Sequence, residues 1–315
     1  MKKGTYPISA SSSPEEAADW LEWRALRAES GSVSNADLQS ELARSGSSDS
    51  TAPESLPSGI DDPGALRAET LVAEAFDRIA ERIRHCGESG KYPFRVNGSC
   101  LERLPDAEKS LYVFLLLLST YGPKKHPNKE IPAGTFEDIS RFAAEGYFGG
   151  TSSGVRSFAF GFPRRIKPAG FHKAVASLCK ETGEGDGVRD TPITSDQKDG
   201  KLDLIVWRAF PDARRGKWWG FGQCAAGSDW HEKLNELQPS DFCRLWIQGE
   251  IPVYPSRLFF LPHIIDMQHW FQKSLAAGIV FDRCRIVASA NKIETDTEKA
   301  FRKWSDTILQ NEVRA

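Results

Sequence analysis

Two strand-like segments joined by a short turn constrain the fold of this chain more than any other feature. Leu202 to Phe210 and Lys217 to Cys224 are rich in branched and aromatic residues, and the six residues between them have the sequence PDARRG. Proline, aspartate and glycine between two such segments predict a β-hairpin. Helix and strand patterns alternate around this hairpin. The sequence therefore predicts an α/β fold with a mixed central sheet flanked by helices.

The elements expected around the hairpin follow from apolar periodicity and from capping residues. The expected helices cover residues 135–147, 171–181, 229–237, 240–247, 266–276 and 295–309, and the expected strands cover 157–162, 257–261 and 280–288. Together with the hairpin they predict one α/β domain over residues 134–315.

The first part of the chain has a different character. Residues 14–43 have helical periodicity, interrupted where Ser34 to Asp37 gives a new capping signal. A short extended piece over residues 92–96 precedes a leucine-rich helix pattern over 106–121. Ser, Gly, Pro and Asp dominate between Ser45 and Pro63, which is typical of a flexible linker. We therefore expect a helical N-terminal segment over 1–44, a linker over 45–63 and a helical region over 64–133.

Composition narrows the class of protein. The 315 residues are 40% hydrophobic and 27% charged, with a formal net charge of -2, as in ordinary soluble proteins. The most apolar stretch, Leu111 to Leu118, is too short to span a bilayer, and the polar start predicts no secretory signal. The six cysteines are scattered without a CxxC pair, so we expect buried thiols in a reducing cytoplasm rather than zinc fingers or a disulfide framework.

Asp203 and Gln223 are the polar residues of the hairpin that point to chemistry. Asp203 precedes an apolar strand, and Gln223 sits late in an aromatic one, where burying an amide is costly unless it is bonded. Their side-chain oxygens, together with the Cys224 carbonyl, are the hard ligands that Mg²⁺ prefers. The alternatives are a solvated Asp at a strand end and a Gln that bonds a neighbouring loop.

Other candidate residues lie outside the hairpin. Glu137, expected in the first turn of its helix, is either a ligand or a partner of the helix dipole. Lys233 is either a group that contacts a phosphate or an exposed lysine. The acidic loop with Glu184 and Asp186 is expected near the active face, and it lacks a phosphate-binding pattern. The chain contains no GxSxG or HExxH motif and no deaminase cysteine pair.

The order of helix with Glu137, strand, strand with Asp203, strand with Gln223, helix and strand resembles the PD-(D/E)XK restriction-endonuclease-like superfamily. The resemblance covers roughly residues 134–290 and implies a metal-dependent nuclease domain that uses Mg²⁺ or Mn²⁺. It matches Asp203 to the central Asp, Glu137 to the helical Glu, and Gln223-Cys224-Ala225 to the (E/Q)-x-K tripeptide of the Mrr-like variants.

One position departs from that pattern, since Ala225 stands where a lysine is expected. Some members of the superfamily carry this lysine on the following helix, which makes Lys233 the expected substitute. The resemblance implies hydrolysis of phosphodiester bonds, in DNA rather than RNA, and a setting in restriction or anti-phage defence. Two basic clusters are expected either to contact the nucleic-acid backbone or to form solvated turns: Arg164 with Arg165, and Arg214 with Arg215.

Two alternatives to an active nuclease stay open at this stage. One is a catalytically inactive nuclease-fold subunit that binds nucleic acid or a partner protein, with the N-terminal helical segment as a docking element. The other is a small-molecule enzyme that uses the acidic loop around Glu184.

Overall fold

The structure is a computed structural model that describes residues 6–46, 63–86, 90–123, 130–161, 170–191 and 200–313. The chain divides into two compact units, the first made of Met1–Thr120 and Arg302–Ala315 and the second of Tyr121–Phe301. The N-terminal segment and residues 64–120 of the expected helical region thus belong to one unit, and residues 121–133 belong to the other. Within the described residues, no helix combines the length and the apolar character needed to cross a membrane.

The first unit combines helices with a small sheet, whereas the sequence predicted a helical region with a single extended piece over residues 92–96. Its three strands are antiparallel in the order β1-β3-β2, and β2 and β3 form a hairpin. The elements are α1 (Pro14–Arg27), β1 (Ser32–Ser34), α2 (Asn35–Gly46), α3 (Pro63–His85), β2 (Phe94–Asn97), β3 (Cys100–Arg103), the 3-10 turn η1 (Ala107–Lys109) and α4 (Leu111–Tyr121). The ends of the expected linker are therefore helical, and its remainder, residues 47–62, lies outside the described residues.

Side-chain caps explain where the first two helices begin. The Ser13 and Glu16 side chains exchange hydrogen bonds with each other's backbone amides, a capping box at the start of α1. The Ser34 amide donates to Asp37 Oδ2 at 2.8 Å, and the Asp37 amide donates to Ser34 Oγ at 3.2 Å. This second exchange confirms the capping signal predicted at residue 34.

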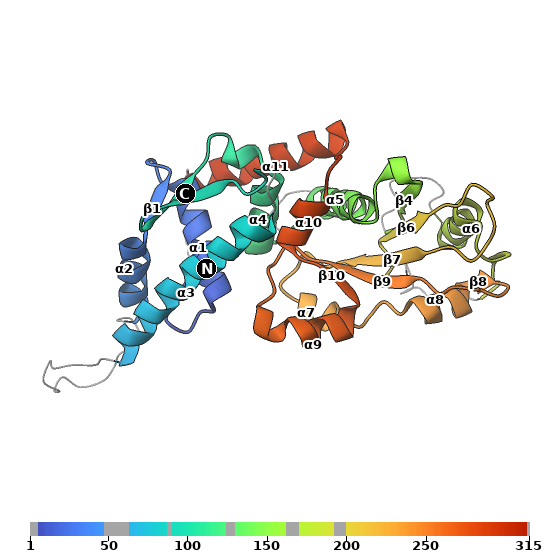
Figure 1. The fold of residues 1–315 in the computed structure, drawn as a ribbon, viewed down its shortest axis with the longest axis horizontal. Helices are drawn as coiled ribbons and strands as arrows, with labels where there is room; N and C mark the ends of the chain where they lie inside the picture. Colours follow the sequence, from blue (N-terminus) through green and yellow to red (C-terminus); the bar gives the residue numbers. More distant parts are fainter. Residues whose placement is uncertain are drawn as a thin grey trace, which may run out of the picture. The chain divides into compact units, whose positions relative to one another are not determined.

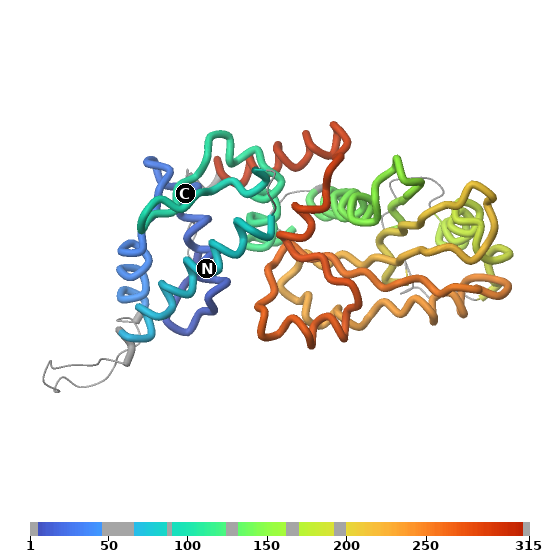
Figure 2. Tube along the Cα trace, in the orientation of Figure 1, coloured from blue at the N-terminus to red at the C-terminus, as the bar shows by residue number. Residues whose placement is uncertain are grey.

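Two features fill the interior of the first unit. The side chains of residues 112–118 in α4 are fully buried, and the ring of Phe114 packs edge-on against Trp304. Trp304 belongs to α11 (Thr295–Val313), whose C-terminal part returns to the first unit, as the red end of the chain does in Figure 2. A buried ionic cluster joins Arg82 to Glu22 at 2.9 Å. Because Trp304 packs on Phe114, the C-terminal residues complete the core of the N-terminal unit.

The second unit confirms the predicted α/β fold with a mixed sheet, drawn in green to red in Figure 1. Its five strands lie in the order β10-β9-β7-β6-β4; β4, β6 and β7 are antiparallel, and β7, β9 and β10 are parallel. The strands are β4 (Val155–Ala159), β6 (Leu204–Arg208), β7 (Trp219–Cys224), β9 (Ser256–Phe260) and β10 (Ile279–Phe281), and β5 (Gly187–Val188) pairs separately with β8 (Ile247–Gln248).

Helices and a 3-10 turn surround this sheet. They are α5 (Glu130–Tyr147), η3 (Thr151–Ser153), α6 (Phe171–Thr182), α7 (Trp230–Lys233), α8 (Pro239–Trp246), α9 (Met267–Ala277) and α10 (Arg283–Ser289). The predicted strand over 280–288 is wrong beyond Phe281. Asp282 caps a helix there, because its side chain accepts from the Arg285 amide at 3.0 Å. The predicted helix over 229–237 contracts to the single turn α7.

Candidate functional site

Asp203 lies at the edge of the sheet where β6 begins and β7 ends. The antiparallel register pairs Leu204 with Gly222, so Asp203 comes beside the last residues of β7. Three backbone contacts fix it there. Its amide donates to the Gly222 carbonyl at 2.9 Å, and its own carbonyl accepts from Phe160 at 2.6 Å and from Gly161 at 2.9 Å. Backbone hydrogen bonds to the segments on both sides therefore fix the position of Asp203.

Glu137 approaches the same point from α5. A methyl group built on Gly161 would lie 3.1 Å from Glu137 Oε2 and 3.2 Å from Asp203 Oδ1. The two carboxylates, 66 positions apart in the chain, thus converge on the small space beside Gly161. The expectation that Glu137 sits in the first helical turn is wrong, because α5 begins at Glu130 and accommodates Pro132 near its start. Its position is therefore interior to the helix.

Cys224 completes one side of this space through its backbone and its thiol. Its amide donates to Asp203 Oδ2 at 2.7 Å, which leaves Oδ1 directed toward Gly161. Burial, followed by the negative charges of Asp203 and Glu137, raises the pKa of the Cys224 thiol well above its usual value. This raised pKa favours the protonated thiol at neutral pH, which does not suit a role as a nucleophile.

Gln223 is buried, with 5% of its surface exposed, and its amide has a defined orientation. Nε2 donates to Glu236 Oε2 at 2.8 Å, whereas Oε1 has no hydrogen-bond partner among the described residues. Because a carboxylate accepts only, it fixes the nitrogen end of the amide toward itself. A buried acceptor without a partner costs about 1–3 kcal/mol, so a bound donor or cation at Oε1 would remove this cost.

The two positions expected to carry or replace the catalytic lysine differ in their surroundings. Ala225 is fully buried in an apolar cluster with Trp230 and Phe259. Its methyl side chain supplies no polar group to the candidate site. Lys233 ends α7 and pairs with Asp229, four residues earlier, at 3.1 Å. Lys201 forms an ion pair with the other oxygen of Glu236, at 3.3 Å. Neither Lys201 nor Glu236 was singled out from the sequence, although Lys201 stands only two positions before Asp203.

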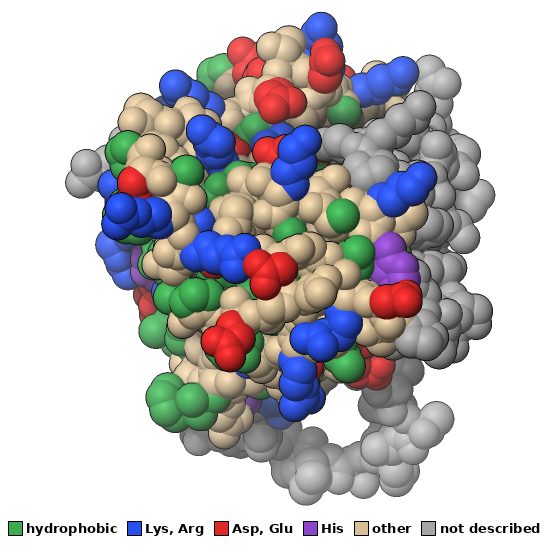
Figure 3. Space-filling view, turned by 90° about the vertical axis from the view of Figure 1, so that its right-hand side faces the viewer, with side chains coloured by type: hydrophobic (Ala, Val, Ile, Leu, Met, Phe, Trp, Pro, Cys, Tyr) green, Lys and Arg blue, Asp and Glu red, His purple; other side chains and the backbone are tan. Residues whose placement is uncertain are grey.

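The arginines proposed to contact nucleic acid have different environments. Arg164 and Arg165 lie outside the described residues. Arg214 is 85% exposed, and its nearest acidic partner, Asp212, is 3.8 Å away. Arg215 instead donates to Asp186 Oδ1 at 2.5 Å. On the face of the molecule in Figure 3, basic side chains are interspersed with acidic ones.

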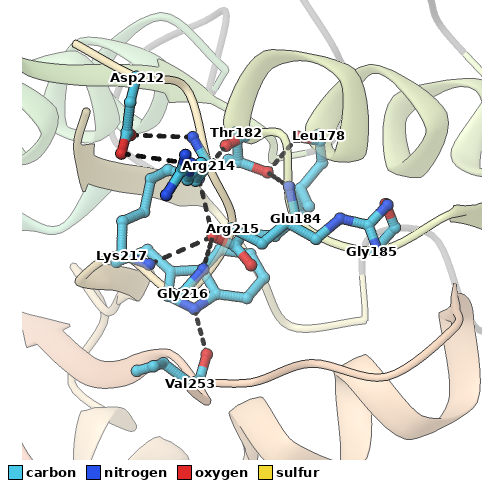
Figure 4. A network of polar contacts seen from close by, with 11 residues as sticks. Leu178, Thr182, Glu184, Gly185, Asp212, Arg214, Arg215, Gly216, Lys217 and Val253 are labelled. Carbon is cyan, nitrogen blue, oxygen red and sulfur yellow. Dashed lines mark hydrogen bonds and ion pairs between the residues drawn. The ribbon is translucent and has the colours of Figure 1, made fainter. Parts of the chain in front are cut away.

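The acidic loop after α6 belongs to the opposite end of the hairpin from Asp203. Glu184 Oε1 accepts from Lys217 Nζ at 2.8 Å and from the Gly216 amide at 2.9 Å, and both donors lie where the turn leads into β7 (Figure 4). The side chains of Glu184 and Lys217 are 0% and 3% exposed. The expectation that this loop lies near the active face is therefore wrong, and its glutamate has a structural partner.

The donors brought together are oxygens, but they are few. Among the described residues, no group of three or more His, Cys, Asp or Glu side chains is arranged to hold a metal ion. Glu137 and Asp203 supply two carboxylates, and Gln223 supplies an amide oxygen at the same sheet edge. Oxygen donors of this kind match Mg²⁺ and Mn²⁺ rather than softer ions.

Comparison with known proteins gives no family for the chain. No protein-family model matches it, and no curated protein and no solved structure matches it.

Proposed function

We propose that this chain is a metal-dependent nuclease that hydrolyses phosphodiester bonds in DNA. The observation that carries the proposal is the convergence of Glu137 and Asp203 beside Gly161, at the sheet edge where Gln223 has a buried oxygen without a partner. Glu137 and Asp203 are half-buried, and two ionised carboxylates that converge repel each other, so a cation between them would offset that repulsion. A hard divalent cation matches the two carboxylates, and the amide oxygen of Gln223, on the neighbouring strand, is a ligand of the same type.

The order of elements supports the resemblance to the PD-(D/E)XK superfamily. Helix α5 with Glu137, strand β4, the hairpin of β6 and β7, helices α7 and α8, and strand β9 occur in this order, with α6 and β5 inserted between β4 and β6 and β8 before β9; β9 is parallel to β7. This is the order that the resemblance implies, with Asp203 and Gln223 on the two strands of the hairpin. The restriction-endonuclease-like fold and a role in restriction or anti-phage defence are parts of this proposal.

The residues of the chain have distinct tasks in the proposed reaction. Asp203 and Glu137 would hold the cation, and the Cys224 amide keeps Asp203 in one orientation. When bound, Mg²⁺ or Mn²⁺ would lower the pKa of a water molecule and offset the charge that develops on the phosphate. In hydrolysis the water oxygen bonds to phosphorus, the phosphorus–oxygen ester bond breaks, and a proton from water ends on the leaving oxygen.

Replacing Asp203→Ala tests this proposal. We expect the wild type to cleave DNA with Mg²⁺ or Mn²⁺, and the variant to lose both cleavage and Mn²⁺ binding, measured by gel electrophoresis and by electron paramagnetic resonance. The variant should remain folded, because the backbone bonds of Asp203 do not need its side chain. A wild type that neither binds Mn²⁺ nor cleaves any nucleic acid would refute the proposal.

A catalytically inactive nuclease-fold subunit is the second candidate. Ala225, buried in place of the expected lysine, is the observation that favours it. Such a subunit would bind nucleic acid or a partner protein without hydrolysis. Gel shifts at several salt concentrations, run beside the cleavage assay, separate the two candidates, because salt-sensitive binding without cleavage supports the inactive subunit.

A further inference from the structure

The superfamily pattern places a lysine ammonium against the substrate phosphate, and Ala225 stands at that position in this chain. Two lysines of the second unit are candidates, Lys201 and Lys233, and each has an ion-pair partner. We propose that Lys201 is the residue that contacts the phosphate of the nucleic acid bound at Glu137 and Asp203. This inference rests on the proposed nuclease function and names a catalytic residue for it.

The backbone holds Lys201 in an uncommon conformation beside Asp203. Its φ is 65°, in the left-handed region that residues other than glycine seldom occupy, and Gly200 before it has a φ of 62°. Gly200 packs closely on the Phe242 ring, and the next side chain, Leu202, is fully buried. Such strain persists only where the surroundings impose it, and it is concentrated at functional sites.

The connection to the site is short in the chain and in space. Two residues span at most about 7 Å, so the Cα atoms of Lys201 and Asp203 are no farther apart than that. The Lys201 ammonium lies 3.3 Å from Glu236 Oε1, and the other oxygen of Glu236 accepts from Gln223 Nε2 at 2.8 Å. One carboxylate thus links the lysine to the amide of Gln223, and the next residue of that strand, Cys224, donates its amide to Asp203.

Lys201 is also accessible enough to leave this partner for a substrate. Its side chain is 57% exposed and that of Glu236 is 30% exposed. An ion pair with this exposure contributes at most about 1 kcal/mol, so a phosphate can compete for the ammonium. By contrast, Lys233 is 32% exposed and pairs at 3.1 Å with Asp229 in its own helical turn, rather than with a residue bonded to Gln223.

The two lysines provide a matched pair of variants. Lys201→Met and Lys233→Met each remove one ammonium and keep an unbranched side chain that is one atom shorter. We expect Lys201→Met to slow single-turnover cleavage of double-stranded DNA on the order of 100-fold, as the loss of one charge-stabilising donor does. Mn²⁺ binding should be unchanged in it, and Lys201→Arg should recover part of the rate. Lys233→Met should cleave at nearly the wild-type rate.

The outcomes separate this inference from the proposed function. Loss of cleavage in Lys233→Met alone, or equal losses in both methionine variants, overturns the role of Lys201 while the nuclease function stands. If Lys201→Met does not fold, Lys201→Arg is measured instead. A folded Lys201→Arg variant that cleaves DNA no faster than Asp203→Ala also overturns the role of Lys201. A wild type that cleaves no DNA refutes the nuclease function, and the role of Lys201 falls with it.

Discussion

Gly161 leaves room for the two carboxylates of the candidate site. Any larger residue there would place its Cβ 3.1 Å from Glu137 Oε2 and 3.2 Å from Asp203 Oδ1, which is closer than ordinary contact. The carboxylates would then have to move apart by a few tenths of an ångström. The absence of a side chain at this position is therefore a condition for their convergence.

We predict that Gly161→Ala weakens Mn²⁺ binding on the order of 10-fold, as changes that displace metal ligands do. Titration calorimetry with Mn²⁺ measures the effect. Gly170→Ala is the matched control, because a methyl group there has no neighbour within 4 Å. Equal Mn²⁺ affinities in the two variants would show that the space beside Gly161 is not the binding site.

At the residue scale, the sequence pattern of the hairpin predicted part of the candidate site. Asp203 and Gln223 were expected at one sheet edge because a hairpin brings the start of one strand beside the end of the next. Gly161, Lys201 and Glu236 were missed, since each acquires its significance through a contact with a residue distant in the chain. An ordinary glycine or glutamate carries no local signal of such a contact.

At the scale of elements, a buried ion pair anchors the hairpin turn to the end of α6. Lys217 donates to Glu184 at 2.8 Å and to the Thr182 carbonyl at 2.7 Å (Figure 4). Buried pairs contribute little when complete, but removing one partner leaves an uncompensated charge. The contact therefore ties the acidic loop to the hairpin without making it a binding site.

We expect Lys217→Met to lower the free energy of unfolding by about 3–5 kcal/mol, because the Glu184 carboxylate stays buried without its cation. The double variant Lys217→Met with Glu184→Gln should be less destabilised, since no charge is then left unpaired. Urea unfolding measures both. Arg214→Met, an exposed cation of the same turn, serves as the control and should change stability by no more than about 0.5 kcal/mol.

Element types were predicted better than element ends. The alternation of helix and strand patterns predicted the mixed sheet correctly, because amphipathic periodicity is a local property. The helical segment Arg283–Ser289 was assigned to a strand, because its apolar residues also fit a buried strand and the Asp282 cap decided the outcome. Of the small sheet in the first unit, β2 matches the extended piece expected over residues 92–96, whereas β1 and β3, only three and four residues long, were missed.

At the scale of the whole molecule, the two units differ in charge. The first contains 16 Lys and Arg residues against 21 Asp and Glu, and the second contains 25 against 22. Binding to a phosphate backbone is governed by local cations, and the second unit also holds the candidate site. Nucleic acid is therefore expected to contact the second unit.

The titration of buried thiols gives a prediction for the stability of the second unit. Burial raises the pKa of Cys179 to about 11 and that of Cys243 to about 12, and the pKa of Cys224 is also raised. These folded-state values lie above the usual thiol pKa, so the unfolded chain loses its protons first as the pH rises. Their contribution to stability is complete below pH 9 and is lost progressively from pH 9 toward pH 12.

Calorimetric unfolding at pH 8 and pH 10.5 should show the transition of the second unit at a lower temperature at the higher pH. Cys243→Ala should reduce this pH dependence, because one titrating thiol is then absent. A transition of the second unit that does not move between the two pH values would contradict the assignment of these thiols as buried and protonated.

The sequence by itself determined the elements whose signals are local: the hairpin, its turn, and the helix starts at residues 13 and 34. It also determined which polar residues the hairpin carries at its edge. Only the tertiary structure decided that Glu137 from α5 meets Asp203 beside Gly161, and that Glu236 joins Lys201 to Gln223. The physical reason is that these contacts depend on packing between segments far apart in the chain, which no local periodicity encodes.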